Sequence, residues 1–250
     1  MKEFIVLIPA RYASTRFPGK PLAKLGGREM ILRVCDRVKE AGLPLAVATD
    51  DKRILDLVEG NGYRCVMTSP DHKSGTDRVA EAYRNLGEDY RVIINVQGDE
   101  PFIAGSQLKA LCDCFADETT EIATLCRPFP ADAPFSALED PNLVKVVRDD
   151  NGRALMFSRN PIPYLRGIEK DNWPSSFPYL THVGIYGYRS DILPRLTALP
   201  QSPLEKAESL EQLRWLQAGY SIATAVTTAP TIGIDTPADL EAAERFLCQG

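Results

Sequence analysis

Cationic side chains are concentrated in one short stretch near the N-terminus. Arg11, Arg16 and Lys20 lie there among small residues, with Gly19 beside the lysine. In a chain that is acidic overall, three cations in one loop favour a polyphosphate ligand, because arginine offers paired donors and lysine a point charge. The alternative is a solvated loop whose charges only maintain solubility. The stretch is not a Walker loop, because Pro21 follows Lys20 where that motif has serine or threonine.

Two aspartates form the second group with chemical potential. Asp99 directly follows an apolar run, in a Gly-Asp-Glu-Pro turn, and Asp235 precedes a Thr-Pro pair that begins the last predicted helix. Carboxylates at strand ends can hold Mg²⁺ against substrate phosphates, which is the usual mode of Mg²⁺ binding. Each aspartate could instead cap a helix. Together with the basic loop, the pair indicates a site in which cations hold phosphates and a metal bridges them.

The elements that must position these residues alternate between strand and helix in the first half of the chain. Short apolar runs have the length and β-branched content of strands buried on both faces. Four such strands alternating with helices predict a parallel, doubly wound α/β sheet, and the basic loop leaves the carboxyl end of the first strand, where open sheets bind ligands. The predicted strands are 4–8, 45–49, 63–67 and 92–96, and the helices are 28–41, one through 54–58, and 77–86 with Thr76 or Asp77 as its N-cap.

The alternation breaks in the second half. Two strand-like segments, 143–148 and 153–158, flank an Asp-Asp-Asn-Gly turn and predict a β-hairpin. We interpret this hairpin as a lid or a dimerisation arm. The segment 161–178, rich in proline and aromatic residues, is predicted as an ordered loop, and 203–218 as one amphipathic helix.

Composition restricts the class of protein. With 250 residues, 44% of them hydrophobic, the chain can bury a large core. A net charge of −5 and a pI near 5.2 argue against an extended nucleic-acid surface, and no apolar run approaches the length of a membrane span. The six cysteines form no C-x-x-C pair and only two histidines are present, which argues against zinc and indicates the reduced thiols of a cytoplasmic protein.

Domain organisation follows from the absence of linkers. The sequence contains no internal repeat and no low-complexity segment. We therefore predict a single domain over 1–250, with 140–200 as a lid or dimerisation subregion within it.

Six stretches of the sequence, taken in order, resemble one family. They are IPARYASTRFPGKPL at 8–22, SGTDR at 74–78, NVQGDEP at 95–101, HVGIYGYR at 182–189, SPLEKAESLEQLR at 202–214 and GIDTPADL at 233–240. The family is that of 3-deoxy-manno-octulosonate cytidylyltransferase, or CMP-Kdo synthetase, and the resemblance covers essentially the whole chain. The residues by themselves indicate only a metal-dependent nucleotidyl or glycosyl transferase.

The resemblance implies a fold and a reaction. The fold is an α/β nucleotidyltransferase (nucleotide-diphospho-sugar transferase) type that usually forms a homodimer. The reaction is transfer of CMP from CTP to the anomeric hydroxyl of 3-deoxy-D-manno-octulosonate (Kdo), giving CMP-Kdo and pyrophosphate for lipopolysaccharide biosynthesis, with Mg²⁺ as cofactor. CTP and Kdo are the expected partners, without nucleic acid or membrane.

The resemblance also implies roles for individual residues. Lys20, Asp99 and Asp235 would be catalytic, and the two aspartates would be the Mg²⁺ ligands. His182 could instead be a structural histidine, Tyr186 a core aromatic residue and Glu211 part of the solvated face of its helix. The implied CTP-binding residues are Arg11, Arg16, Lys20, Ser74, Gly75, Arg78 and Gln97, and the implied sugar-binding residues are Arg159, His182, Tyr186, Glu211 and Gln212.

Two other functions remain open on the sequence. One is an enzyme of the same architecture that activates another acidic sugar, such as the 8-amino analogue of Kdo or an N-acylneuraminate. The other is a non-catalytic module that binds a nucleotide. Retention of Lys20, Asp99 and Asp235 argues against the second.

Overall fold

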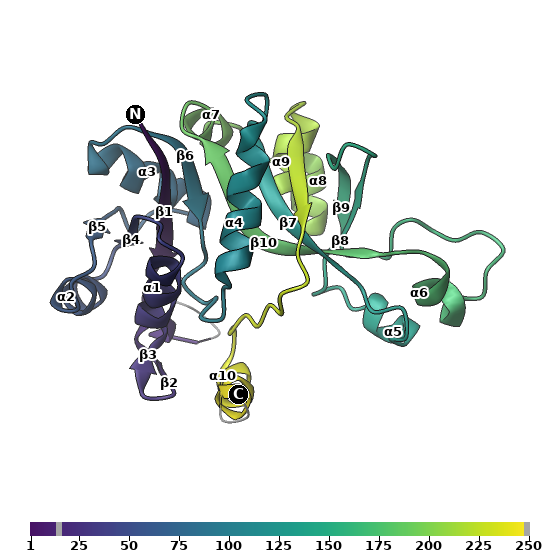
Figure 1. Ribbon diagram of the computed structural model, residues 1–250, viewed down its shortest axis with the longest axis horizontal. Helices are drawn as coiled ribbons and strands as arrows, with labels where there is room; N and C mark the ends of the chain where they lie inside the picture. The colour runs from purple at the N-terminus through teal and green to yellow at the C-terminus, as the bar shows by residue number, and fades with distance from the viewer. Residues whose placement is uncertain (14–16, 248–250) are drawn as a thin grey trace. The chain divides into compact units, whose positions relative to one another are not determined.

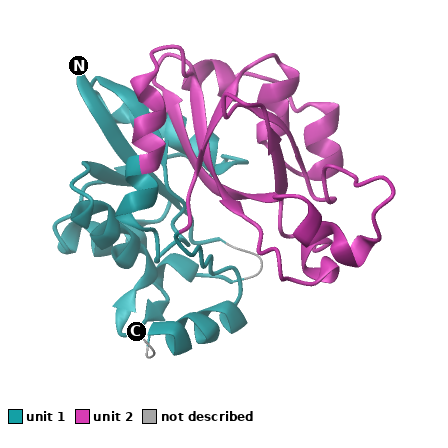
Figure 2. Ribbon diagram, turned by 45° about the vertical axis from the view of Figure 1, so that its right-hand side comes forward, with its two compact units in different colours: residues 1–109, 229–250 teal, residues 110–228 magenta. Residues whose placement is uncertain are grey.

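A computed structural model describes residues 1–13 and 17–247, so Arg16 and Cys248 lie outside the described residues. The chain forms two compact units (Figure 2). Unit 1 contains residues 1–109 and 229–250, and unit 2 contains residues 110–228. The single domain predicted over 1–250 stays a prediction, because compact units can belong to one domain. The predicted 140–200 subregion lies within unit 2.

A parallel sheet forms the centre of unit 1 (Figure 1). Its strand order is β6-β1-β4-β5, and all three pairings are parallel, as the alternation of strands and helices predicts. The elements of unit 1 are β1 (Lys2–Ala10), η1 (Lys20–Leu22), β2 (Lys24–Leu25), β3 (Arg28–Glu29), α1 (Met30–Glu40), β4 (Leu45–Thr49), α2 (Lys52–Gly60), β5 (Cys65–Met67), α3 (Gly75–Leu86), β6 (Tyr90–Asn95) and α10 (Pro237–Leu247), and α4 (Gly105–Asp113) spans its boundary with unit 2.

Burial explains why these segments are strands. Residues Ile5 to Ile8 of β1 are at most 1% exposed, so both faces of the strand are covered. Helix α3 contacts β1 and β4, and α1 contacts β4. Each fully buried aliphatic side chain contributes about 1.5–3 kcal/mol relative to exposure, so a continuous apolar run is the signature of this strand.

The order of the strands creates a crevice in unit 1. From β1 the chain passes through α1 to β4 on one side, whereas β6 pairs with the other side of β1. Ligands of open α/β sheets bind where the direction of winding reverses, outside the carboxyl ends of the strands. In unit 1 this point lies between β1 and β6, where the basic loop and the turn 97–101 emerge.

Unit 2 contains a mixed sheet in the order β11-β7-β10-β8-β9. Strand β7 pairs parallel with β11 and antiparallel with β10, and β10 and β9 both pair antiparallel with β8. The elements are η2 (Cys114–Ala116), β7 (Ile122–Pro128), α5 (Phe135–Leu138), β8 (Lys145–Arg148), β9 (Ala154–Ser158), η3 (Lys170–Asn172), α6 (Trp173–Ser176), β10 (Leu180–Arg189), α7 (Leu193–Thr197), α8 (Pro203–Glu208), α9 (Gln212–Gln217) and β11 (Ile222–Val226).

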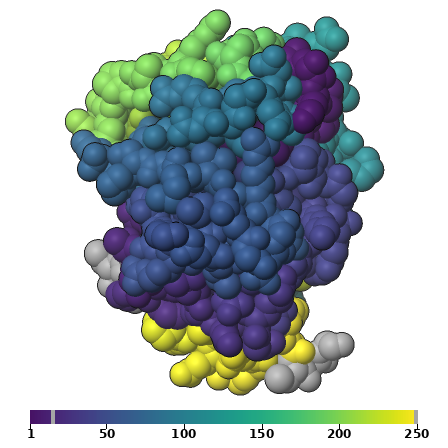
Figure 3. All heavy atoms as spheres, turned by 90° about the vertical axis from the view of Figure 1, so that its left-hand side faces the viewer, coloured from purple at the N-terminus to yellow at the C-terminus, as the bar shows by residue number. Residues whose placement is uncertain are grey.

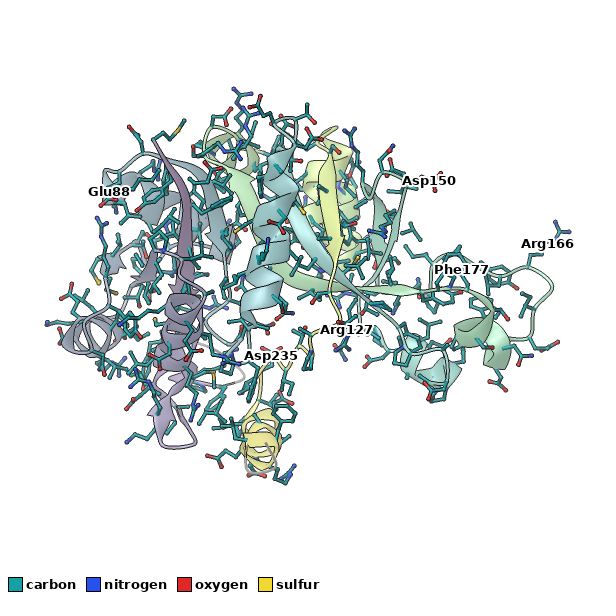
Figure 4. All side chains as sticks on the ribbon, viewed as in Figure 1. Glu88, Arg127, Asp150, Arg166, Phe177 and Asp235 are labelled. Atoms are coloured by element: carbon teal, nitrogen blue, oxygen red, sulfur yellow. The ribbon has the colours of Figure 1, made fainter. Side chains whose placement is uncertain are left out.

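The predicted hairpin is confirmed as β8 and β9, with Asp150 in its turn (Figure 4). Because β8 also pairs with β10, the hairpin is part of the unit 2 sheet. Its role as a lid or arm stays a prediction. The segment 161–178 is ordered as predicted and additionally contains η3 and α6. Trp173, 3% exposed, packs edge-on against Phe135, which explains why this aperiodic segment is fixed.

The prediction of one helix over 203–218 is wrong, because the structure has two helices there, α8 and α9. Ser209 ends α8 in a left-handed conformation with φ of 52°. Arg159 bonds the freed carbonyls, since its Nε donates to Glu208 O at 2.6 Å and its Nη2 to Ser209 O at 3.4 Å. A side chain distant in sequence thus terminates the helix, which hydrophobic periodicity cannot reveal.

No helix within 1–13 and 17–247 combines the length and apolarity needed to cross a bilayer.

Candidate active site

A cavity of about 230 Å³ opens in unit 1 at the carboxyl ends of β1 and β6. Most of the residues predicted for phosphate, base and metal line this cavity. Arg16, the remaining predicted phosphate ligand, lies outside the described residues. The predicted residues in the lining are Arg11, Lys20, Ser74, Gly75, Arg78, Gln97, Asp99 and Asp235.

The loop after β1 presents Arg11 and Lys20 to the cavity. Gly19 turns the chain back with φ of 73°, a conformation that favours glycine, and its N–H donates to Tyr12 O at 3.0 Å. Lys20 then begins η1, where the fixed φ of Pro21 suits the first turn. The ammonium of Lys20 therefore projects from a backbone that local geometry restrains.

Lys20 joins the two predicted metal ligands. Its Nζ lies 2.5 Å from Asp99 Oδ2 and 3.2 Å from Asp235 Oδ1. The backbone also holds the two acidic segments together, because Ile234 N donates to Asp99 O at 3.1 Å. Figure 4 labels Asp235 on the segment that leads into α10. One cation thus contacts two carboxylates that are far apart in the sequence.

Another residue caps the helix that follows Asp235. Thr236 Oγ1 accepts a hydrogen bond from Asp239 N at 3.2 Å. The carboxylate of Asp239 in turn accepts from Thr236 N at 2.8 Å and from Asp235 N at 3.0 Å. The alternative role of Asp235 as an N-cap is therefore taken by Thr236, and the Asp235 carboxylate contacts Lys20 instead.

The Asp99–Asp235 pair fits a hard divalent cation. Its oxygens already share one cationic nitrogen, that of Lys20, so both can reach a single ion. Within the described part of the chain, no group of three or more His, Cys, Asp or Glu residues is arranged to hold a metal. Two carboxylates suit Mg²⁺ in particular, because Mg²⁺ in nucleotide sites takes its remaining ligands from substrate phosphates and water.

The turn after β6 contains two residues that the sequence reasoning did not single out. A Cβ on Gly98 would lie 3.0 Å from Pro9 O, so a side chain there would push the turn away from β1. Burial, followed by the charges of Asp99 and Asp235, raises the pKa of Glu100 to about 7. The charges of Asp99 and Asp235, which add to the effect of burial, also attract a cation. The Gly-Asp-Glu-Pro turn was the available signal for both residues.

Ser74 begins the helix that supplies one wall of the cavity. Its Oγ accepts a hydrogen bond from Asp77 N at 3.1 Å and makes Ser74 the N-cap of α3. The predicted cap, Thr76 or Asp77, is therefore wrong. Ser74 takes this role because its backbone is extended and its hydroxyl reaches the amide three residues on.

Gly75 leaves a gap between two walls of the cavity. A Cβ at this position would lie 3.4 Å from Pro9 Cγ and 3.6 Å from Gln97 Oε1, which is ordinary contact distance. Gln97 in turn donates from Nε2 to Asn95 Oδ1 at 3.1 Å, which fixes its amide. A flat ring could use the space that a side chain on Gly75 would fill.

Arg78 is a buried cation in the cavity wall, only 3% exposed. Its Nη2 donates to Asp50 Oδ2 at 2.8 Å and its Nη1 to Thr68 Oγ1 at 2.6 Å. These partners follow β4 and β5, so Arg78 ties α3 to two strand ends. A paired and hydrogen-bonded guanidinium can remain charged at this depth.

His72 and Lys73 line the same cavity but were not predicted as site residues. The His72 ring contacts the Glu81 carboxylate through Nε2, and Ser69 N donates to the same oxygen at 2.8 Å. These contacts, Ser69 first and His72 second, lower the pKa of Glu81. Glu81 therefore anchors the loop that carries His72 and Lys73. Their place directly before the SGTDR motif at 74–78 was the available signal.

The predicted sugar-binding residues lie in unit 2, and most of them gather there. The rings of His182 and Tyr186 are 5.3 Å apart, and the charge of Glu211 contributes to raising the pKa of Tyr186 after burial, the main cause. Within the described residues, the buried Nε2 of Gln212 has no hydrogen-bond partner. An orphaned buried polar atom is costly, so this amide can use an acceptor on a ligand.

Thr124, which the sequence reasoning missed, holds the strand that carries His182 and Tyr186. Between them β10 has an irregularity in its pairing with β7. Thr124 Oγ1 donates toward Ile185 O at 2.8 Å and lies 3.2 Å from Val183 O. It is also 3.0 Å from His182 Nε2, and since the hydroxyl proton is already used, Nε2 is the donor there.

Arg159 is tied to backbone carbonyls, and no described contact joins it to His182 or Tyr186. Its Nη1 donates to Pro141 O at 2.7 Å, in addition to its bonds at the end of α8. Its backbone N donates to the Glu208 carboxylate at 2.9 Å. The predicted role of Arg159 in binding a sugar carboxylate stays a prediction beside this structural one.

The site and the sheet together define a class of protein. A crevice at the topological switch point, lined by cations and a carboxylate pair, is the arrangement of a phosphate-binding α/β enzyme. A model of the cytidylyltransferase family matches residues 5–222. The fold and the family model thus point to the same class.

Similar proteins have narrower names. The chain is 55% identical to a 3-deoxy-manno-octulosonate cytidylyltransferase of Bacteroides thetaiotaomicron, over 98% of each chain. It is 54% identical to a protein of the same name from Parabacteroides distasonis, over 99% of each. A solved structure of a CMP:2-keto-3-deoxy-manno-octonic acid synthetase complexed with CTP superposes with a TM-score of 0.90 at 41% identity, covering 99% of both chains.

The chain belongs to the cytidylyltransferase family, and within it to the 3-deoxy-manno-octulosonate cytidylyltransferases. The predicted family and the predicted nucleotidyltransferase-type α/β fold are confirmed. A solved structure of a cytidylyltransferase from Leptospira borgpetersenii shares the fold, with a TM-score of 0.65 at 17% identity. The superposition covers 100% of this chain and 88% of the Leptospira chain.

Proposed function

We propose that this protein transfers CMP from CTP to the anomeric hydroxyl of Kdo, releasing CMP-Kdo and pyrophosphate for lipopolysaccharide biosynthesis. The observation that carries the proposal is the contact of Lys20 with both Asp99 and Asp235, in a cavity that Arg11 also lines. The names of its relatives, at 55% and 54% identity over nearly the full chain, support the choice of substrates.

The nucleotide is proposed to bind in the unit 1 cavity. Arg11 and Lys20, with Arg16 of the same loop, would neutralise the triphosphate, and Lys20 would stabilise the charge that grows on pyrophosphate as it leaves. The base would take the gap beside Gly75, between Pro9 and Gln97. The fixed amide of Gln97 and the backbone of the α3 start can read the edge of cytosine.

Mg²⁺ is the proposed cofactor, held by Asp99 and Asp235. When bound, the ion supplies charge neutralisation at the phosphates and lowers the pKa of the attacking hydroxyl. In its presence the Lys20 ammonium is free to donate to phosphate oxygens, since the aspartates no longer depend on it for neutralisation. No side chain is assigned as general base.

The sugar is proposed to bind to the unit 2 residues. Kdo is an anionic polyol, so it needs an arginine for its carboxylate and polar groups for its hydroxyls. Arg159 is the proposed carboxylate ligand, Tyr186 is proposed to contact the sugar, and the buried Gln212 amide has an unused hydrogen-bond donor. His182 and Glu211 complete the proposed set.

The substrates can be tested directly. The protein is incubated with CTP, Mg²⁺ and one sugar, and pyrophosphate release is followed. We expect release with Kdo. Release only with the 8-amino analogue or with an N-acylneuraminate would replace Kdo as the substrate, and CTP binding without release for any sugar would indicate a non-catalytic module.

Homodimer formation and a cytoplasmic location are further proposals. Unit 2 exposes large apolar side chains, among them Tyr164 at 72% and Leu155 at 62%, which a second copy could cover. Sedimentation equilibrium of the wild type and of Tyr164→Ser tests the dimer. The thiols of Cys35, Cys65, Cys114 and Cys126, with no disulfide among the described residues, support a reducing compartment.

A further inference from the structure

The loop that carries Arg11 and Lys20 is anchored through the side chain between them, Tyr12. The backbone bond from Gly19 N to Tyr12 O, 3.0 Å long, joins the two ends of the loop. A Cβ on Gly19 would lie 3.2 Å from the Tyr12 ring, so glycine and ring are in close contact. The position of Tyr12 therefore restricts the position of Gly19 and of the Lys20 backbone that follows it.

Arg53 of α2 stacks on this ring. Its Cζ lies 3.4 Å from the centroid of Tyr12, the distance of a guanidinium laid flat on an aromatic face. Asp51 orients the guanidinium, because it accepts from Nε at 2.9 Å and from Nη2 at 2.6 Å. Asp51 is itself fixed as the N-cap of α2. The stack thus connects the phosphate-binding loop to a helix that supplies no residue to the cavity lining.

We propose that Arg53 is a positioning residue for CTP binding, which holds the loop of Arg11 and Lys20 through its stack on Tyr12. The inference rests on the proposed function of that loop. The Arg53 side chain is 58% exposed on a surface helix (Figures 1 and 3), so removing it takes nothing from the core. Its effect on binding can therefore be separated from an effect on folding.

The stack should act by restricting the loop before the ligand arrives. Without it, Tyr12 has more conformations, and ordering the loop on binding costs more free energy. Arg53→Gln should weaken binding of CTP, and of pyrophosphate alone, by about three- to tenfold, the range expected for a partly exposed cation–π contact. The affinity of Arg53→Lys for CTP should lie between those of the wild type and Arg53→Gln, because lysine keeps the charge but cannot stack or pair with Asp51 in the same plane.

The adjacent Lys52 offers a matched control. It is 80% exposed on the same helix and pairs with Asp56 at 2.7 Å, so Lys52→Gln removes the same charge without touching Tyr12. Titration calorimetry with CTP is performed on both variants, together with thermal unfolding and the KM for CTP. We expect unchanged unfolding midpoints in both variants. Only Arg53→Gln should bind CTP more weakly and show a raised KM for CTP at near-normal kcat.

A double-mutant cycle with Tyr12→Leu isolates the stack. If the two residues act together, the loss in Tyr12→Leu/Arg53→Gln should be smaller than the sum of the single losses. Normal CTP binding in Arg53→Gln, an equal loss in Lys52→Gln or additive losses in the cycle would each overturn the inference. The phosphate site itself is judged separately by Lys20→Ala, whose unchanged CTP affinity would overturn the proposed function.

Discussion

The ammonium of Lys20 lies 2.5 Å from the carboxylate of Asp99, close enough for a charge-assisted hydrogen bond. The same nitrogen contacts Asp235 at 3.2 Å. One ammonium therefore offsets one of the two negative charges of the carboxylate pair. Asp99 and Asp235 would hold a divalent ion through these same oxygens, and the Lys20 ammonium would then be available to the phosphates.

Asp99→Asn should leave folding intact and reduce turnover by about a hundredfold or more, because a lost charged ligand removes several kcal/mol of transition-state stabilisation. Steady-state pyrophosphate release with CTP and Kdo gives the rate. Asp56→Asn, an exposed carboxylate of the same unit paired only with Lys52 in the described contacts, is the control. Near-normal turnover in Asp99→Asn would remove this residue from the metal site.

Lys20→Ala should have opposite effects on the two ligands of its cavity. CTP should bind more weakly, because a cation facing the phosphates is lost. Mn²⁺ in the absence of nucleotide should bind more tightly, because Asp99 and Asp235 are left unneutralised. Electron paramagnetic resonance of free Mn²⁺ measures the second effect. Equal Mn²⁺ affinity in wild type and variant would contradict competition between lysine and metal.

Much of unit 1 could be predicted because one local cause determines each element. The continuous apolar run of β1 predicts a strand buried on both faces, and Pro237 predicts the start of α10. The choice of Ser74 over Thr76 as the cap of α3 could not be predicted, since both residue types suit that position and backbone geometry decides.

The missed features depend on contacts between distant residues. The break between α8 and α9 depends on Arg159, which lies 50 residues before Ser209 in the sequence. The irregular strand that carries His182 rests on Thr124 in the opposing strand. Gly98 matters because of the nearby carbonyl of Pro9. None of these partners can be identified from local pattern or spacing.

His182 should make stability depend on pH. Burial lowers its pKa to about 4, so between that value and its ordinary pKa of 6.5 the unfolded chain takes up a proton that the folded chain does not. The contribution of neutral His182 to the free energy of unfolding is complete above pH 6.5. It declines as the pH falls toward 4, by about 3 kcal/mol at most. Urea unfolding between pH 4.5 and pH 7.5 should therefore give a flatter profile for His182→Gln. Identical slopes would contradict a neutral imidazole at this position.

Thr124→Val should raise the KM for Kdo and leave the KM for CTP unchanged, because the irregular strand loses the hydroxyl that bonds Ile185 O. Unfolding free energy should fall by about 1–3 kcal/mol, the cost of an unpaired buried carbonyl. Thr181→Val is the matched control, since Thr181 lies on β10 and its hydroxyl also bonds a carbonyl across the β7–β10 pair, that of Arg127, at 3.2 Å. A similar rise in the Kdo KM in both variants would assign the effect to general destabilisation.

We propose that the cavity of Lys20, Asp99 and Asp235 supports one direct displacement at the α-phosphorus of CTP by the sugar hydroxyl. Because no enzyme-bound nucleotide is formed in such a step, configuration at phosphorus must invert once. The decisive measurement uses CTP with a chiral α-thiophosphate, Kdo and Mg²⁺, and determines the configuration of the product. We expect CMP-Kdo with inversion, and net retention or a captured covalent CMP–enzyme would contradict a single displacement.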